Sequence, residues 1–222
     1  MTDLTRWTGA ARPGRTVLDG RYARLEPLDA ERHAEDLLAS ALEPGTEARF
    51  RYLFDPPPGD AGEMAAWMKK AAASDDPLFF AVIDRATSLA QGRQALMRID
   101  PANGVIEVGS ILWGPAIART RIATEALYLF ARHVFEDLGY RRFEWKCDSR
   151  NEPSRRAALR FGFSFEGIFR QHMVVKGRNR DTAWYATLDH EWPGLKARFE
   201  SWLEPDNFDA GGQQKRRLNI SP

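Results

Sequence analysis

The chain has 222 residues, 43% of them hydrophobic and 28% charged, values typical of a globular protein that can bury a core. It carries 32 lysines and arginines against 31 acidic residues, for a net charge of +1. This balance excludes a global bias towards nucleic acids or membrane surfaces, so any anion site must be local. The single cysteine, Cys147, excludes a disulfide within the chain. With no signal peptide or apolar run of about 20 residues in view, we expect a cytoplasmic protein without a membrane partner.

The first half of the chain alternates between strand and helix signals. Residues 21–28 alternate in polarity as a strand does, and Asp29 is a favourable cap for a helix that ends at residue 42. The turn cluster FDPPPGD breaks any helix, and a second helix is expected over 61–73. Short apolar or alternating runs then predict three strands, over residues 78–84, 92–100 and 104–114.

Helical periodicity dominates the next segment. Apolar residues recur with helical spacing over 121–138, and Gly139 stands where a helix commonly ends. A strand, a short helix, a long hairpin and an amphipathic helix follow, over residues 141–148, 151–161, 163–192 and 193–203. This order predicts an α+β domain with a mostly antiparallel sheet and one crossover helix after the fourth strand.

The domain is expected at residues 19–203, with a flexible arm at 1–18 and a flexible polar tail at 204–222. The basic run QKRR in the tail is interpreted as solvated. No nucleic-acid partner is expected, because the basic residues do not gather with aromatics on one predicted element. The four histidines show no metal-ligand spacing, so no metal is expected. No motif sets the oligomeric state, which we expect to be a monomer or a homodimer.

Two arginines, Arg119 and Arg121, stand at the start of the helix that follows the fourth strand. A helix N-terminus already carries partial positive charge, so each cation there costs roughly 0.3–1 kcal/mol. A phosphate would accept from the free N–H groups and make both cations favourable. The alternative is that both side chains extend into solvent at small cost. Of the two candidate caps, Ala118 cannot accept a hydrogen bond and Thr120 can.

Three motifs resemble one known superfamily. They are a strand bearing EVG followed by a helix beginning ATEAL, an Asn-x-x-Ser motif followed by RFGF, and the closing hairpin EGIFRQ…GRNRDTAWYATLDHEW. Over roughly residues 20–192 the chain resembles the GNAT N-acetyltransferases. In detail it is similar to the RimJ/RimL-like branch, the ribosomal-protein N-terminal acetyltransferases.

The resemblance implies the GNAT fold, with a central sheet of about seven strands, helices on both faces and a splay between strands 4 and 5. It also implies acetyl transfer from acetyl-CoA to a primary amine, either a protein N-terminus or a small molecule. The amine would attack directly in a ternary complex, without a metal. The alternative is a non-catalytic acyl-CoA-binding or sensing protein with a GNAT fold.

One motif departs from the family. The family's pyrophosphate loop is Gln/Arg-x-x-Gly-x-Gly/Ala, and here residues 118–123 read ARTRIA, so only the last position matches. Arg121 stands where a glycine normally lets the backbone approach phosphate. Either arginine side chains take over charge neutralisation, which we favour, or coenzyme A binding is weakened.

The resemblance also assigns coenzyme contacts to particular residues. Backbone groups of the fourth strand would bind the pantetheine and thioester, the start of the helix over 121–138 would bind the pyrophosphate, and the short helix over 151–161 would add an amide and a cation. In that order the residues are Ser110, Ile111 and Leu112; Arg119, Thr120, Arg121, Ile122, Ala123 and Thr124; Asn151 and Arg156.

Two residues are candidates for catalysis. Glu107 could act as the base, directly or through water, or it could be a solvent-facing or salt-bridged glutamate. Ser154 would lie near the sulfur, although it and Asn151 also suit a helix cap. Gly109 in mid-strand suits a bulge or a close approach. Glu125, early in a helix, is interpreted as structural.

The hairpin tip carries Lys176, Arg178 and Arg180, which either steer an acidic acceptor or are exposed turn residues. Asp181 and Tyr185 are weaker candidates for the same wall. Burial is the expected state of Cys147.

Overall fold

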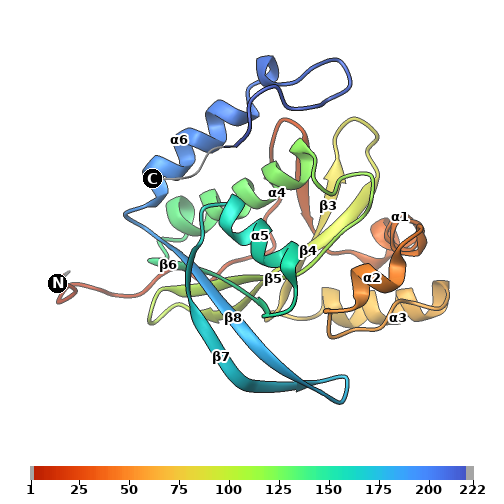
Figure 1. Ribbon diagram of the computed structural model, residues 1–222, viewed down its shortest axis with the longest axis horizontal. Helices are drawn as coiled ribbons and strands as arrows, with labels where there is room; N and C mark the ends of the chain where they lie inside the picture. Colours follow the sequence, from red (N-terminus) through yellow and green to blue (C-terminus); the bar gives the residue numbers. More distant parts are fainter. Residues whose placement is uncertain (1–2, 219–222) are drawn as a thin grey trace.

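Alternating and apolar runs form one eight-stranded sheet in the computed structural model, which describes residues 3–218 (Figure 1). The strands, in chain order, are β1 (Leu18–Asp19), β2 (Ala23–Pro27), β3 (Leu78–Asp84), β4 (Ala90–Asp100), β5 (Val105–Trp113), β6 (Arg142–Asp148), β7 (Ser164–Val175) and β8 (Arg178–Leu188). Their order in the sheet is β1-β2-β3-β4-β5-β6-β8-β7. β5 and β6 pair in parallel, and the other six pairings are antiparallel. The predicted α+β class is confirmed, and the eighth strand is the short β1.

The helices begin and end largely where capping residues predict. They are α1 (Ala30–Leu42), α2 (Thr46–Phe50), α3 (Ala61–Ala72), α4 (Arg121–Arg132), α5 (Glu152–Arg160) and α6 (Trp192–Leu203), with a π-helical turn at His133–Asp137 and a 3-10 turn at Pro205–Asn207. Asp29 caps α1 by accepting from two backbone N–H groups, as expected. Gly139 follows the π-helical turn with φ 73°, the left-handed conformation expected of it. α2 was not predicted, because five residues are too few for a periodic signal.

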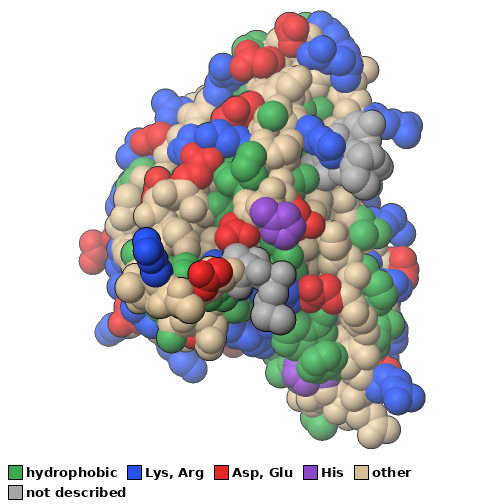
Figure 2. All heavy atoms as spheres, turned by 90° about the vertical axis from the view of Figure 1, so that its left-hand side faces the viewer, with side chains coloured by type: hydrophobic (Ala, Val, Ile, Leu, Met, Phe, Trp, Pro, Cys, Tyr) green, Lys and Arg blue, Asp and Glu red, His purple; other side chains and the backbone are tan. Residues whose placement is uncertain are grey.

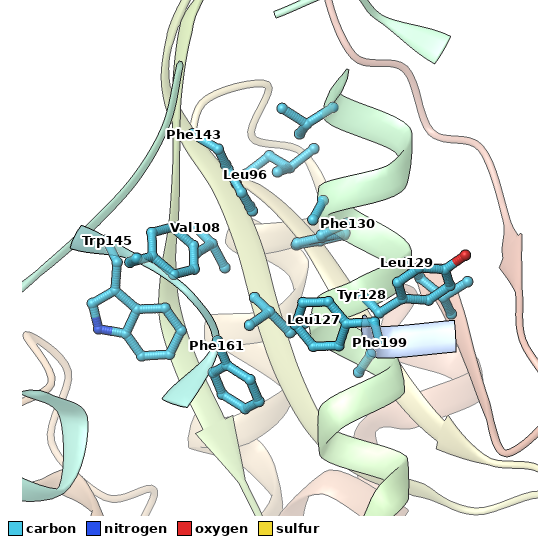
Figure 3. Packing of buried hydrophobic residues seen from close by; sticks show 14 of the residues in the cluster. Leu96, Val108, Leu127, Tyr128, Leu129, Phe130, Phe143, Trp145, Phe161 and Phe199 are labelled. Atoms are coloured by element: carbon cyan, nitrogen blue, oxygen red, sulfur yellow. The ribbon is translucent and has the colours of Figure 1, made fainter. Parts of the chain in front are cut away.

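Helices cover both faces of the sheet, as the resemblance implied. In Figure 1, α1, α2 and α3 are grouped on one side, and α4, α5 and α6 lie away from them. Alternation along β3 explains how one strand serves both faces, since Phe80 packs in the core with α4 and Phe79 in the core with α1 and α3. In the larger core, Phe130 of α4 lies towards Leu96, and Leu127 lies towards Phe161 and Phe199 (Figure 3).

Both terminal segments pack onto the domain, which differs from the expected flexible arm at 1–18 and flexible tail at 204–222. The Trp7 indole donates to the Ala102 carbonyl at 2.7 Å. Phe208 is buried between the rings of Tyr22 and Trp202. The expectation of flexible ends rested on the polar composition of these segments, and a single buried aromatic residue in each hardly changes that composition. Residues 1–2 of the expected arm and 219–222 of the expected tail lie outside the described residues.

The strands β5 and β6 separate halfway along their length. Their pairing runs from Val105 opposite Arg142 to Val108 opposite Trp145 and then stops. Beyond that point β5 continues to pair with β4, and β6 with β8. Beyond Val108 and Trp145, the backbone N–H and C=O groups on the facing edges of β5 and β6 therefore do not hydrogen-bond to each other. Since β1 is the additional strand, this is the expected splay between the fourth and fifth strands.

The β7–β8 hairpin projects away from the rest of the domain (Figure 1). β7 is the edge strand and exposes four large hydrophobic side chains, Phe165, Ile168, Phe169 and Val174. Figure 2 shows hydrophobic side chains gathered low on the displayed face, where this hairpin projects. Within residues 3–218 no helix is both long enough and apolar enough to span a bilayer.

Candidate active site at the splay of the sheet

A cavity of about 120 Å³ lies where β5 and β6 separate. It is lined by β4, the outer half of β5, the end of β6, the start of α5, the segment after α2 and one side chain of β8. The cavity brings together Glu107, Ser110, Ile111, Asn151 and Ser154, five of the residues singled out in the sequence. The separated strand edges thus border a partly open cavity lined by both polar and charged groups.

A bulge reshapes β5 at the cavity. Ser110 has φ 49°, and the register with β4 shifts between Gly109 and Leu112. The Ser110 carbonyl accepts from the buried guanidinium of Arg93 at 3.3 Å. Gly109 lies beside the thioether of Met97, so a side chain there would overlap that sulfur. The expected bulge and close approach are therefore both present.

Glu107 is buried, 2% exposed, and bound to two cations. Arg98 Nη1 lies 2.7 Å from each carboxylate oxygen, and Lys146 Nζ lies 3.0 Å from Oε2. Burial raises the pKa of Glu107, and the charges of Lys146 and Arg98 oppose that rise. The salt-bridged alternative is what the structure contains, in a carboxylate that also lines the cavity.

Ser154 has its hydroxyl oxygen fixed by a neighbouring ring. The Trp145 indole donates to Ser154 Oγ at 2.9 Å, and the Asn151 side chain caps α5 by accepting from Ser154 N at 3.2 Å. Since Oγ accepts from Trp145, its own proton is available to donate. Cys147 lies nearby, and burial raises the pKa of its thiol, which favours the protonated form.

The two arginines at the start of α4 have different environments. Thr120 caps the helix by accepting from Ile122 N at 3.1 Å. Arg119 is exposed, with φ 65°. The Arg121 guanidinium instead lies over the Tyr22 ring, 4.3 Å from its centroid, and near Phe208. The expectation that both arginines meet either phosphate or water therefore needs correction, because Arg121 has aromatic partners.

The rest of this helix start is packed. Ala123 and Thr124 are buried, and the Thr124 hydroxyl donates to the Thr120 carbonyl at 3.1 Å. Arg160 of α5 donates to Thr124 Oγ1 at 3.2 Å and forms no ion pair within residues 3–218. The sequence analysis missed Arg160. It is the last residue of α5, about two and a half turns after Asn151, and no spacing in the sequence indicated its contact with α4.

Three other residues predicted for the site lie outside the cavity. Arg156 is exposed on α5, 3.9 Å from Glu152. Tyr185 is buried, and its hydroxyl accepts from Arg155, so it does not form an acceptor wall. Asp181 accepts hydrogen bonds within the β7–β8 hairpin. These residues have local partners instead of a place in the cavity.

Glu125 has a structural place, as expected. It is 4% exposed and accepts from the backbone N–H groups of Arg21, Tyr22 and Ala23 at 2.8, 2.5 and 2.6 Å. It therefore ties α4 to the start of β2. No group of three metal-ligating side chains is present in the part of the chain that the structure describes.

The splayed parallel pair, the strand bulge and the adjoining helix start define the architecture of an acyl-CoA-dependent acetyltransferase. The family model "Acetyltransferase (GNAT) domain" matches residues 23–164. The chain therefore belongs to the GNAT acetyltransferase family, and the resemblance found in the sequence is confirmed.

Three similar proteins extend this result. A crystal structure of a GCN5-related N-acetyltransferase from Brucella melitensis is 60% identical, covers 97% of both chains and has a TM-score of 0.95. The uncharacterized N-acetyltransferase p20 of Bacillus licheniformis is 29% identical over 52% of this chain and 64% of its own. YdaF of Bacillus subtilis, provisionally named a ribosomal N-acetyltransferase, is 30% identical over 47% of this chain and 57% of its own. The alignments thus span less than two thirds of these two curated relatives.

Proposed function

We propose that this chain transfers an acetyl group from acetyl-CoA to a primary amine by direct attack in a ternary complex. The observation that carries the proposal is the separation of β5 from β6 after Val108 and Trp145. The pantetheine arm would lie between the strands as an extra strand does. Backbone groups of Ser110, Ile111 and Leu112 would bind it and the thioester.

The remainder of the coenzyme would extend to the start of α4. The first-turn N–H groups of Arg121 and Ala123 have no partner within an α-helix, whereas Ile122 N is capped by Thr120. Arg119 is exposed beside them and would supply a cation to the pyrophosphate. Asn151 has its side-chain nitrogen free of the cap and would donate to the pantetheine. Arg156 would contact a more distant phosphate.

The reaction needs a neutral amine and a proton for the leaving group. The amine nitrogen bonds to the thioester carbonyl carbon, the C–S bond breaks, and the sulfur leaves with the electron pair. The proton that the nitrogen loses as the amide forms passes to that sulfur. Glu107 would receive the ammonium proton through a water, because both its oxygens already accept from cations. Ser154 would donate its proton in a hydrogen bond to the thiolate. The raised pKa of the Cys147 thiol argues against a covalent intermediate on that residue.

The acceptor we propose is a protein N-terminal α-amine, with a small primary amine as the other candidate. Support comes from the name of one relative, a provisional ribosomal N-acetyltransferase. The cavity shares Tyr52, Asp148 and Arg180 with a second pocket of about 310 Å³ at the hairpin, which we call the channel and which would receive an extended peptide end.

One observation favours a second candidate function, acyl-CoA binding or sensing without catalysis. Glu107 is held by Arg98 and Lys146, and a carboxylate paired in this way is a weaker proton acceptor. This candidate predicts tight coenzyme binding and no turnover on any amine.

Two measurements in sequence test the proposal. Thermal unfolding with acetyl-CoA at a hundredfold excess over Kd should show a stabilisation of about 2.7 kcal/mol. Mass spectrometry of a peptide panel should then detect acetylated N-termini. Binding without acetylation of any amine would support the sensing function. Absence of binding would overturn the proposed function.

A further inference from the structure

Arg180 is a buried cation without a carboxylate partner. It lies on β8 and is 7% exposed. Its Nε donates to Thr182 Oγ1 at 3.2 Å, and its guanidinium lies 5.5 Å from the centroid of the Phe54 ring. It forms no ion pair among residues 3–218, and the nearby Asp148 is held by Arg150 at 2.8 Å. Arg180 therefore has no carboxylate paired with it directly, although the charges of Asp148 and Glu107 act on it from a greater distance.

The other buried cations of the site differ in this respect. Arg93 is 3% exposed and pairs with Asp55 at 3.3 Å. The Lys146 side chain is 5% exposed and pairs with both Glu107 and Glu144. An unpaired buried charge costs free energy that a bound anion would recover. Desolvation lowers the pKa of Arg180, and the charges of Asp148 and Glu107 offset that shift only in part.

Arg180 lies at the junction of two cavities. It lines the active-site cavity together with Glu107 and Ser154, and it lines the adjoining channel of about 310 Å³. Four more cations line that channel, namely Arg51, Arg150, Lys176 and Arg178. Asp148 is the one acidic residue among the described residues that line the channel, and Arg150 neutralises it. The pocket beside the active-site cavity is therefore strongly positive, which favours anionic ligands.

We propose that the acceptor is a peptide with an acidic side chain close to its N-terminus, and that Arg180 binds this carboxylate while the amine reaches the active site. The planar guanidinium can bind a carboxylate through two parallel hydrogen bonds. The cations of the channel increase the local concentration of such peptides. This inference rests on the proposed N-acetyltransferase function and specifies its substrate class.

Matched peptides test the inference. Two acceptor peptides differ only in glutamate or glutamine at the second position, a second pair carries the exchange at the third, and kcat/KM is measured for each by mass spectrometry. For at least one pair we expect the native protein to prefer glutamate about tenfold, or about 1.4 kcal/mol. In Arg180→Met the glutamate-to-glutamine ratio should fall to about one. Arg6→Met removes an exposed arginine outside the site and should keep the native ratio. Arg180→Lys, which retains charge without the planar fork, should give an intermediate ratio.

The possible results separate this inference from the function on which it rests. Acetylation of both members of each pair at equal rates would overturn the inference and leave the proposed function standing. A loss of acetyl-CoA affinity in Arg180→Met would also overturn it, because Arg180 would then serve the coenzyme. If no peptide is acetylated, the proposed function fails for peptides, and calorimetric titration of the same peptides decides the inference. Tighter glutamate binding that Arg180→Met abolishes would support it, and equal binding would overturn it. If Arg180→Met does not fold, Arg180→Lys carries the same comparisons.

Discussion

The substitution Glu107→Gln tests whether the buried carboxylate is a base or only a structural counter-ion. The native side chain accepts twice from Arg98 at 2.7 Å and once from Lys146 at 3.0 Å. Glutamine keeps the shape but removes the negative charge. Lys146 retains Glu144 as a partner, and the Arg98 side chain is 39% exposed and can be solvated. We therefore expect the loss of stability to be that of one charged hydrogen bond, about 1.5–3 kcal/mol, measured by urea unfolding.

If Glu107 receives the proton, Glu107→Gln should also lower kcat strongly, beyond what the loss of stability explains. Loss of a general base typically lowers kcat by about 10²–10⁴-fold, and the acetyl-CoA affinity should stay within twofold of the native value. Steady-state kinetics against the best peptide and calorimetric titration with acetyl-CoA measure the two quantities. A decrease in kcat of less than about tenfold, with the expected loss of stability, would refute the role as base.

Arg98→Met adds a pH test of the same reasoning. Because the Arg98 charge lowers the pKa of Glu107, its removal should raise that pKa. A base must be deprotonated, so the acid limb of the kcat/KM profile should move to higher pH. An unmoved acid limb would mean that another group titrates.

The remaining predictions concern the coenzyme site and the core. Arg119→Met should raise the Kd for acetyl-CoA roughly tenfold at low salt, whereas Arg121→Met should leave it unchanged and cost about 0.5–1 kcal/mol of stability through the lost ring contact. Equal effects of both on Kd would contradict the separation of the two side chains. Ser154→Ala should lower kcat more than acetyl-CoA affinity, and equal losses would point to a purely structural hydroxyl. Glu125→Ala leaves three backbone N–H groups without an acceptor and should lower the free energy of unfolding by about 3 kcal/mol or more, measured by urea unfolding. Glu125→Gln should lower it less, and a loss below about 1 kcal/mol for Glu125→Ala would contradict this role.

Local signals predicted most of the fold. Alternation, apolar runs and capping residues such as Asp29 depend on neighbours a few positions away, so they were visible in the sequence. The packing of the two termini was not, because Trp7 and Phe208 meet partners distant along the chain. β1 was missed for the same reason, since two residues gain their strand conformation only from pairing with β2.

The candidate site was predicted less completely than the fold. The motifs indicated Glu107 and Ser154, but not that Arg98 and Lys146 hold the carboxylate or that Trp145 fixes the hydroxyl. Those contacts come from three strands and a helix, and no sequence spacing encodes them. Arg121 illustrates the same limit, since its aromatic partners lie about 100 residues before it and 87 after it.

The departure from the glycine loop has a physical consequence for the coenzyme site. A glycine at position 121 would offer only backbone to the pyrophosphate, whereas Arg121 is held by aromatic rings from both ends of the chain. Arg160 beside the helix start also lies over two rings, those of Phe161 and Trp202. The nearby cation without such a contact is Arg119, which is exposed. Backbone N–H groups of the first turn remain suited to an anion whatever side chain stands there. The ARTRIA sequence is therefore compatible with coenzyme binding through Arg119 and the helix start, with Arg121 fastening the terminal segments to α4.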